Sequence, residues 1–359
     1  MAIHFTQERW SILKDTYARW WNGTLSRPLV QLTVADAYVP DRPEPQAPLL
    51  CQSSCHRLDI PAEEIIDRLD YELSRKKFLG DAFPRVNFDC FGPGVLSAFC
   101  GARLDNSSGA VWFFPQEPKE IAEISVRYDP ENVWVRRIKD LYRAGNERWN
   151  GQVLMGMPDL GGILDVAAVF RGSEELMYDL FDEPEEVLRL CGEIETAWLE
   201  AFSDLNSVLS PACPGYSDWL GIYSEKPSYV LQSDFSYMTS NEMFREFALP
   251  GLERLSAAIP NTVYHLDGVG QLPHLDDLLT MKDIAGIQWV AGAGKPGAAH
   301  WPEVYQKIAA AGKGCKVEGT PEEFHWLTGQ VSQGLAYNLE VYKEWLEDVL
   351  RFLGPHVPR

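Results

Sequence analysis

Residues 261–294 constrain the fold of this chain more than any other stretch of its 359 residues. They begin with a β-branched and aromatic run at 262–264, continue with leucines at helical spacing, and reach a second apolar run at 284–290. A glycine-rich loop at 291–294 ends that run. The pattern predicts two parallel strands joined by a helix. Polar residues stand at the carboxyl end of the first strand, where α/β folds place their chemistry.

Strand-like and helix-like segments alternate along the whole chain, which predicts an α/β protein with a parallel sheet. Because barrels of this length commonly form one domain, we predict a single (β/α)8 TIM barrel over residues 1–359. A helical extension at 5–22 precedes it, and a long first loop follows the first strand. The other predicted strands lie at residues 27–34, 84–91, 153–157, 228–232, 313–318 and 334–338.

The long first loop, at about residues 35–60, is rich in proline and poor in apolar residues. Because it follows the first strand, a barrel would place it at the catalytic mouth. One interpretation is a lid that offers Gln52, Ser53 or His56 to the pocket. The other is a surface excursion against the first helix, and long loops divide about evenly between the two.

Side chains that can bind a metal or move a proton follow most of the predicted strands. In a barrel these strand ends converge on one mouth. Carboxylates and a histidine gathered there can bind a divalent cation, zinc above all, and their mutual repulsion would suit general acid–base chemistry. The residues concerned are Asp89, Asp159, Asp234, His265, Asp267, Glu318, Asn338 and Glu340.

Each of these residues also has a structural interpretation, as a helix cap or a turn former, which we favour for Asp159. For His265 and Asp267 we favour a functional role, because residues two apart on a strand face the same side of the sheet. The candidate catalytic residues are Asp89, Asp234, His265 and Asp267. The candidate metal ligands are His265, Asp267, Glu340, Glu318 and Cys315.

Aromatic residues near predicted strand ends and loops allow two interpretations. One is an aromatic-lined pocket for a ring-shaped or apolar substrate, and the other is ordinary core and helix packing, which we favour for any single one of them. The candidate substrate-binding residues are Tyr216, Trp219, Tyr223, Gln288 and Trp289.

The charge and the cysteines limit the classes of function. The net charge of −20 opposes binding to nucleic acid or to an anionic membrane, and no run of about 18 apolar residues could span one. The first residues, MAIHFTQERW, do not form a signal peptide. Seven irregularly spaced cysteines are typical of a reduced, cytoplasmic protein. GxSxG and HExxH motifs are absent from the sequence, so serine hydrolase and thermolysin-type chemistry have no support.

From residue 84 onward the order of motifs resembles the uroporphyrinogen decarboxylase superfamily, which includes corrinoid-dependent methyltransferases. The segments that carry the resemblance are RVNFD at 85–89, MPDLGG at 157–162, and QSD at 232–234 followed by TSNEMF and FALP. This resemblance implies a (β/α)8 barrel. In the methyltransferase branch, His-x-Cys-Gly and a later Cys bind zinc. Here His265 and Gly268 match, Asp267 replaces the first Cys, and Asn338 or Glu340 replaces the second.

The resemblance therefore implies a zinc-dependent methyltransferase that moves a methyl group between a small O- or N-methyl substrate and a corrinoid protein. Oxygen ligands suit an ether, amine or carboxylate substrate better than a thiol. The alternative is a cofactor-independent decarboxylase, because Asp89 matches that branch, although its arginine-rich motif is missing. A non-catalytic ligand-binding barrel is the third hypothesis. The oligomeric state stays open, with a homodimer as one arrangement.

Overall fold

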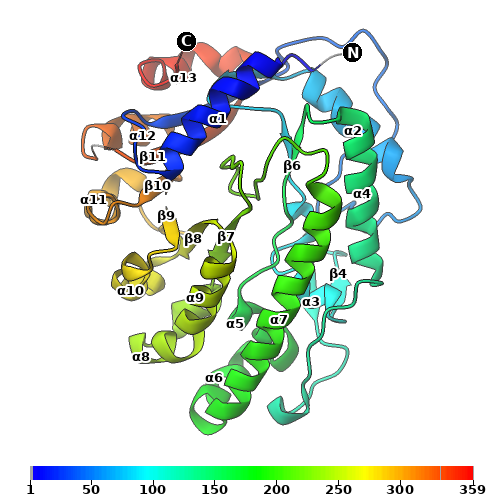
Figure 1. Ribbon diagram of the computed structural model, residues 1–359, viewed down its shortest axis with the longest axis vertical. Coiled ribbons are helices and arrows are strands. Elements are labelled where there is room, and N and C mark those ends of the chain that lie inside the picture. Colours follow the sequence, from blue (N-terminus) through cyan, green and yellow to red (C-terminus); the bar gives the residue numbers. More distant parts are fainter. Residues whose placement is uncertain (1–2, 332, 359) are drawn as a thin grey trace.

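The computed structural model describes residues 3–331 and 333–358, which form a mixed α/β fold with a mainly parallel sheet (Figure 1). This confirms the predicted class and the alternation of strands with helices. The parallel strands are β1 (Leu29–Ala35), β3 (Arg85–Val86), β6 (Leu154–Met155), β7 (Ser228–Gln232), β8 (Asn261–Asp267), β9 (Ile284–Val290), β10 (Gly314–Val317) and β11 (Leu335–Tyr342).

The hydrogen-bonded ladder runs in the order β2-β1-β11-β10-β9-β8-β7, with β2 (Lys77–Gly80) antiparallel to β1. The strands β3 and β6 pair with each other in a separate parallel ribbon. Within residues 3–331 and 333–358 no strand pairing joins this ladder to the β3-β6 ribbon, so closure of the predicted barrel is not detected. The strand predicted at 84–91 is shorter than expected, because Asp89–Phe91 forms a 3₁₀ turn (η1) after Val86.

The strands β7 to β10 have an interior row of polar side chains at one level. Residues paired across parallel strands face the same side, so each row of the register occupies one layer of the interior. The polar row is Gln232, His265, Gln288 and Lys316, and a row nearer the amino ends consists of Val230, Val263, Gly286 and Gly314. The interior is therefore apolar at the amino ends of the strands and polar toward their carboxyl ends.

Helix α1 (Gln7–Trp21) packs at the amino ends of the strands. Its Trp10, Tyr17 and Trp20 belong to a buried cluster with Val230 and Val263. Trp20 also donates its indole N–H to the carbonyl of Gly334, 3.1 Å away. Because α1 occupies this end, the carboxyl ends of the strands are left for a site. The predicted helical extension is confirmed.

The remaining helices pack around the strands, and α4 and α7 are the longest in Figure 1. Residues 241–258 are helical, with a π turn at Phe244–Ala248 in their middle. The helices are α2 (Ala62–Ser74), α3 (Leu96–Phe99), α4 (Val133–Trp149), α5 (Ile163–Arg171), α6 (Ser173–Asp182), α7 (Pro184–Leu209), α8 (Asn241–Met243), α9 (Leu249–Ala258), α10 (Leu275–Thr280), α11 (Pro302–Ala310), α12 (Pro321–Thr328) and α13 (Leu346–Leu353).

None of the helices in the described part of the chain has the length and apolar character needed to cross a membrane. All seven cysteines are free thiols, four of them buried. The long first loop connects β1 to α2, and it is joined to that helix by ion pairs from Arg42 to Asp67 and Asp70.

Candidate functional site

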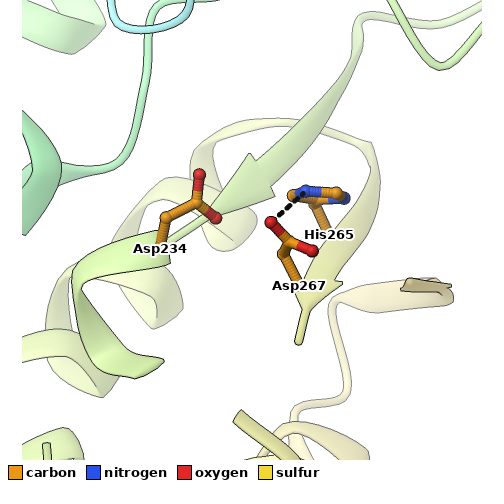
Figure 2. A group of neighbouring side chains, drawn as sticks. All are labelled: Asp234, His265 and Asp267. Carbon is orange, nitrogen blue, oxygen red and sulfur yellow. Dashed lines mark ion pairs between the residues drawn. The ribbon is translucent and has the colours of Figure 1, made fainter. Parts of the chain in front are cut away.

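Asp234, His265 and Asp267 come together at the carboxyl ends of β7 and β8 (Figure 2). One ligand-type atom from each lies within 4.8 Å of the others. His265 and Asp267 are two apart on β8, so both side chains point to the same side of the strand, and Asp234 begins the 3₁₀ turn η3 (Asp234–Met238) that follows β7. Three of the four predicted catalytic residues therefore form one cluster.

A chain of hydrogen bonds fixes the orientation of His265. The ammonium group of buried Lys316 donates to Glu318 Oε1 at 2.6 Å, and Gln288 Nε2 donates to the same oxygen at 2.8 Å. The carboxylate of Glu318 can only accept hydrogen bonds, so the amide of Gln288 must direct its NH₂ group toward Glu318. Its oxygen Oε1 then lies 2.6 Å from His265 Nδ1. Nδ1 therefore carries the proton, and Nε2 turns its lone pair toward Asp267 Oδ2 at 4.0 Å.

Desolvation and charge set the protonation states in the cluster. Burial lowers the pKa of His265, which favours the neutral imidazole. Although Asp234 is exposed, desolvation by the surrounding protein and repulsion from Asp165 and Asp267 raise its pKa to about 8. Metal-free, the cluster thus consists of a neutral histidine beside a carboxyl group that holds its proton near neutral pH.

Asp165, which the sequence analysis did not single out, determines where Asp234 lies. Its carboxylate accepts the backbone N–H groups of Asp234 at 3.1 Å and Phe235 at 2.7 Å, and also that of Gly162 at the start of α5. Burial raises the pKa of Asp165. Asp165 is the third residue of helix α5, which begins directly after Gly161-Gly162. An acidic residue at this position is typical of a helix cap, so the sequence could have indicated this role.

Two of the predicted substrate-binding residues adjoin the cluster. Trp219 meets the His265 ring edge-on with centroids 5.0 Å apart, and Gln288 is the hydrogen-bond partner of His265. The indole Nε1 of Trp219 is buried and has no partner among the described residues. Trp219 therefore forms one wall of the site with a free donor.

The other predicted substrate-binding residues lie elsewhere. Tyr223 packs on Trp10 and Tyr17 of α1, at the opposite end of the strands. Trp289 faces outward and contacts Trp301 just before α11, because the side chains of β9 alternate and Gln288 faces inward. The backbone of Tyr216 pairs with that of Ser224 in an isolated bridge before β7, and no contact joins it to the cluster among the described residues.

The same alternation excludes Cys315 from the cluster. Its thiol points toward the carbonyl of Tyr305 in α11 and is completely buried, and this burial raises its pKa. Glu340 lies on β11, where it accepts a 2.8 Å hydrogen bond from Lys76. Glu318 contacts Gln288 rather than His265. Of the predicted metal ligands, only His265 and Asp267 belong to the three-residue group found in the described chain.

Asp89 and Asp159 follow other strands. Asp89 begins the turn after β3, and desolvation raises its pKa even though the residue is exposed. Asp159 is buried and accepts the N–H of Gly161 at 2.9 Å, which is the turn-forming role that we favoured; burial raises its pKa to about 7.

A largely apolar pocket of about 530 Å³ adjoins the cluster on the side of Asp234. Asp165, Trp112 of β5 (Trp112–Phe114) and Met238 line it, as does Gln52 of the long first loop. Gln52 accepts the backbone N–H of Val111 at 2.9 Å, which joins the loop to this wall. His56 and Ser53 line a separate surface pocket instead.

Replacing Gln52 with alanine should loosen this loop. The N–H of Val111 would lose its acceptor, so we expect the free energy of unfolding to fall by about 1 kcal/mol and trypsin to cleave faster after exposed Arg57. Limited proteolysis with thermal melting measures both. Ser53→Ala is the control, because the Ser53 hydroxyl contacts only Cys51 among the described residues. Equal cleavage rates in the two variants would contradict an anchoring role for Gln52.

No protein-family model and no curated protein matches the sequence. Among solved structures, a methyltransferase from Methanosarcina mazei aligns with a TM-score of 0.60 and 13% identity, over 92% of this chain and 93% of its own. A mandelate racemase/muconate lactonizing enzyme from Sulfitobacter sp. aligns with a TM-score of 0.34 and 10% identity, over 93% and 59%. The first alignment identifies a shared fold, and the second is too weak to support an argument.

Proposed function

We propose that this chain is a zinc-dependent methyltransferase of the uroporphyrinogen decarboxylase superfamily, built as one (β/α)8 barrel domain over residues 1–359. The observation that carries the proposal is the orientation of His265, whose Nε2 lies 4.0 Å from Asp267 Oδ2 in a group that includes Asp234, while its other nitrogen is held by Gln288. Metal-binding histidines characteristically donate their second ring N–H to a fixed acceptor in this way. The shared fold with a methyltransferase agrees with this proposal.

The donor set fits zinc. One imidazole nitrogen and two carboxylate oxygens are common zinc ligands, and three protein ligands leave a position for substrate, as in catalytic sites. Bound there, zinc would supply a Lewis acid that polarises the heteroatom bearing the methyl group. Trp219 would exclude water from one side of His265, and Asp234 would give up its proton when a cation binds.

We propose a corrinoid protein as the partner that exchanges the methyl group with the small O- or N-methyl substrate. Apolar side chains beside the cluster support a docking role: Trp112 is 61% exposed and Met238 is 51% exposed, and both line the pocket next to Asp234. Exposed apolar patches of this kind typically mark interaction sites. The seven free thiols support a cytoplasmic location.

Two measurements test the proposal. Titration of the metal-free protein with zinc should give one tightly bound ion per chain. Incubation with cob(I)alamin and methoxybenzoates or methylamines should then produce the absorbance of methylcob(III)alamin, at a rate that depends on zinc. If the protein binds no divalent cation and methylates no corrinoid, the proposal is wrong.

Gln288→Leu should weaken zinc binding by about 10- to 100-fold, because the acceptor that holds His265 Nδ1 is lost. Competition with a chromogenic chelator measures the affinity. Trp289→Phe is the matched control: it is the next residue on β9, but its side chain faces α11. Equal losses in both variants would show that the effect comes from the strand and not from the hydrogen bond.

Cofactor-independent decarboxylation is the second candidate, because Asp89 follows β3 and has a raised pKa. It predicts CO₂ release from a carboxylated ring without metal, and Asp89→Asn should abolish that release. If CO₂ release continued unchanged in the variant, this candidate would be eliminated. Ligand binding without turnover in either assay would favour a binding protein.

A further inference from the structure

Arg85 is a cation that the cluster does not use. It lies on β3, and its Nη1 is buried without a hydrogen-bond partner among the described residues. No ion pair to Arg85 occurs in that part of the chain either, whereas the salt bridges of most other arginines are well formed. Burying an unpaired charge costs free energy, so a buried cation is usually paired with a counter-ion.

Arg85 is one of the residues that line a cavity. One lobe has a volume of about 390 Å³ and the adjoining lobe about 440 Å³. Both are lined by the same five residues, so they form one space between β1, β3 and β11. These shared residues are Leu73, Lys76, Arg85, Asn87 and Glu340. Phe78 and Phe83 add an apolar wall to the first lobe, whose lining is otherwise mainly polar.

The chain around Arg85 is shaped to hold the guanidinium in place. Gly221 has φ +78°, and a Cβ at this position would overlap the Arg85 guanidinium. Next to it, Asn87 Oδ1 is buried without a partner among the described residues, while its Nδ2 contacts the carbonyl of Trp219 at 3.4 Å. Trp219 in turn packs against the ring of His265. Asn87 and Trp219 therefore connect the lining of the cavity to the proposed metal ligands.

Three carboxylates act electrostatically on Arg85, namely Asp218, Asp89 and Glu340. Glu340 is paired with Lys76 at 2.8 Å, and Asp218 accepts the N–H of Leu220 at 2.9 Å. Asp89 is exposed at the turn after β3, and none of the three makes an ion pair or hydrogen bond with Arg85 in the described chain. The charge of Arg85 is therefore free to pair with a group that enters the cavity.

We propose that this cavity binds a carboxylate of the substrate, with Arg85 as its counter-ion. Arginine suits this task because its planar fork matches the two oxygens of a carboxylate. The substrate class is then a small organic acid whose other end reaches His265. This inference deepens the proposed function and rests on it for the reacting end, whereas the carboxylate site itself can be tested without turnover.

The test compares benzoate with benzamide, which have the same shape but differ in charge. Isothermal titration of the purified chain should give saturable binding of benzoate and at least tenfold weaker binding of benzamide. Arg85→Met should weaken benzoate binding by about 10- to 100-fold, as expected for loss of a charged hydrogen bond, and Arg85→Lys should lose less. Equal affinities for benzoate and benzamide in the unmodified chain would overturn the inference without relying on any variant.

Two controls separate this inference from the proposed function. Arg75→Met removes a cation from the rim of the same cavity, but Arg75 is paired with Glu72 and Asp36, so benzoate affinity should change less than about twofold. His265→Ala should still bind benzoate, and Arg85→Met should still bind zinc. Loss of benzoate binding in Arg75→Met but not in Arg85→Met would overturn the carboxylate site, while absence of zinc binding in every protein would overturn only the metal.

Discussion

Replacing His265 with alanine is expected to abolish zinc binding at micromolar concentrations and methyl transfer with it. Zinc sites in proteins gain about 10–16 kcal/mol from roughly four ligands, so one ligand contributes about 3–4 kcal/mol. At 1.4 kcal/mol for each factor of ten, the affinity should fall on the order of a hundred- to a thousandfold. Zinc titration and the corrinoid assay measure the two losses.

The control for this variant is His300→Ala, which removes an exposed histidine outside the cluster. Thermal melting of the metal-free proteins checks that His265→Ala still folds, which is expected because β8 keeps its buried residues Val263, Tyr264 and Leu266. If His265→Ala retains both zinc and activity, the cluster is not the metal site.

Much of the fold could be predicted from residue patterns. Strands β7 and β9 match their predicted bounds because each is a short buried run with clear ends. The second predicted strand ends early, at Val86, because a local 3₁₀ turn at Asp89 competes with extension, and the positive φ of Gly92 then redirects the chain. Ring closure depends on pairing between segments far apart in sequence, which no local pattern encodes.

The cluster itself was partly predictable. His265 and Asp267 share a face because of their spacing, and Asp234 follows a clear strand. Cys315 and Trp289 were misplaced because the sequence does not reveal which alternate residues of a fully buried strand face inward. The structure resolves this through the register, which sets Lys316 and Gln288 at the level of His265.

Charged residues within buried strands are the signal that sequence analysis passed over. Lys316 stands between Cys315 and Val317, and Arg85 directly precedes Val86. A cation in such a run is costly unless it faces a polar interior or a ligand. Lys316 is satisfied by Glu318, whereas Arg85 has no such partner in the described chain. This contrast could not be predicted, because it depends on contacts between distant strands.

The carboxyl group of Asp234 should make the stability of the metal-free protein depend on pH. Desolvation and repulsion from Asp165 and Asp267 raise its pKa from 3.8 to about 8 in the folded, metal-free protein. Between these values the folded state binds more protons than the unfolded state. The free energy of unfolding of the metal-free protein should therefore decrease as pH rises from about 4 to 8.

Zinc should reverse this trend. A cation binds the ionised carboxylate, so zinc affinity should rise with pH, by at most about tenfold per unit, and level off near pH 8. Burial lowers the pKa of His265, so its neutral form is available over most of this range. The gain in melting temperature on adding zinc should accordingly be small at pH 5 and large at pH 8.

Asp234→Asn isolates the contribution of this carboxyl group. The amide cannot ionise, so the variant should lose the part of the decline in metal-free stability that Asp234 contributes between pH 4 and 8, together with much of its zinc affinity. Asp159 and Asp165, whose pKa values are also raised, should keep their part of the decline. Asp41→Asn, an exposed carboxylate outside the cluster, should behave like the unmodified chain. Melting curves recorded with and without zinc from pH 5 to 8.5 measure both the metal-free stability and the gain in melting temperature on adding zinc. A zinc effect that is independent of pH in the unmodified chain would show that Asp234 does not bind the metal.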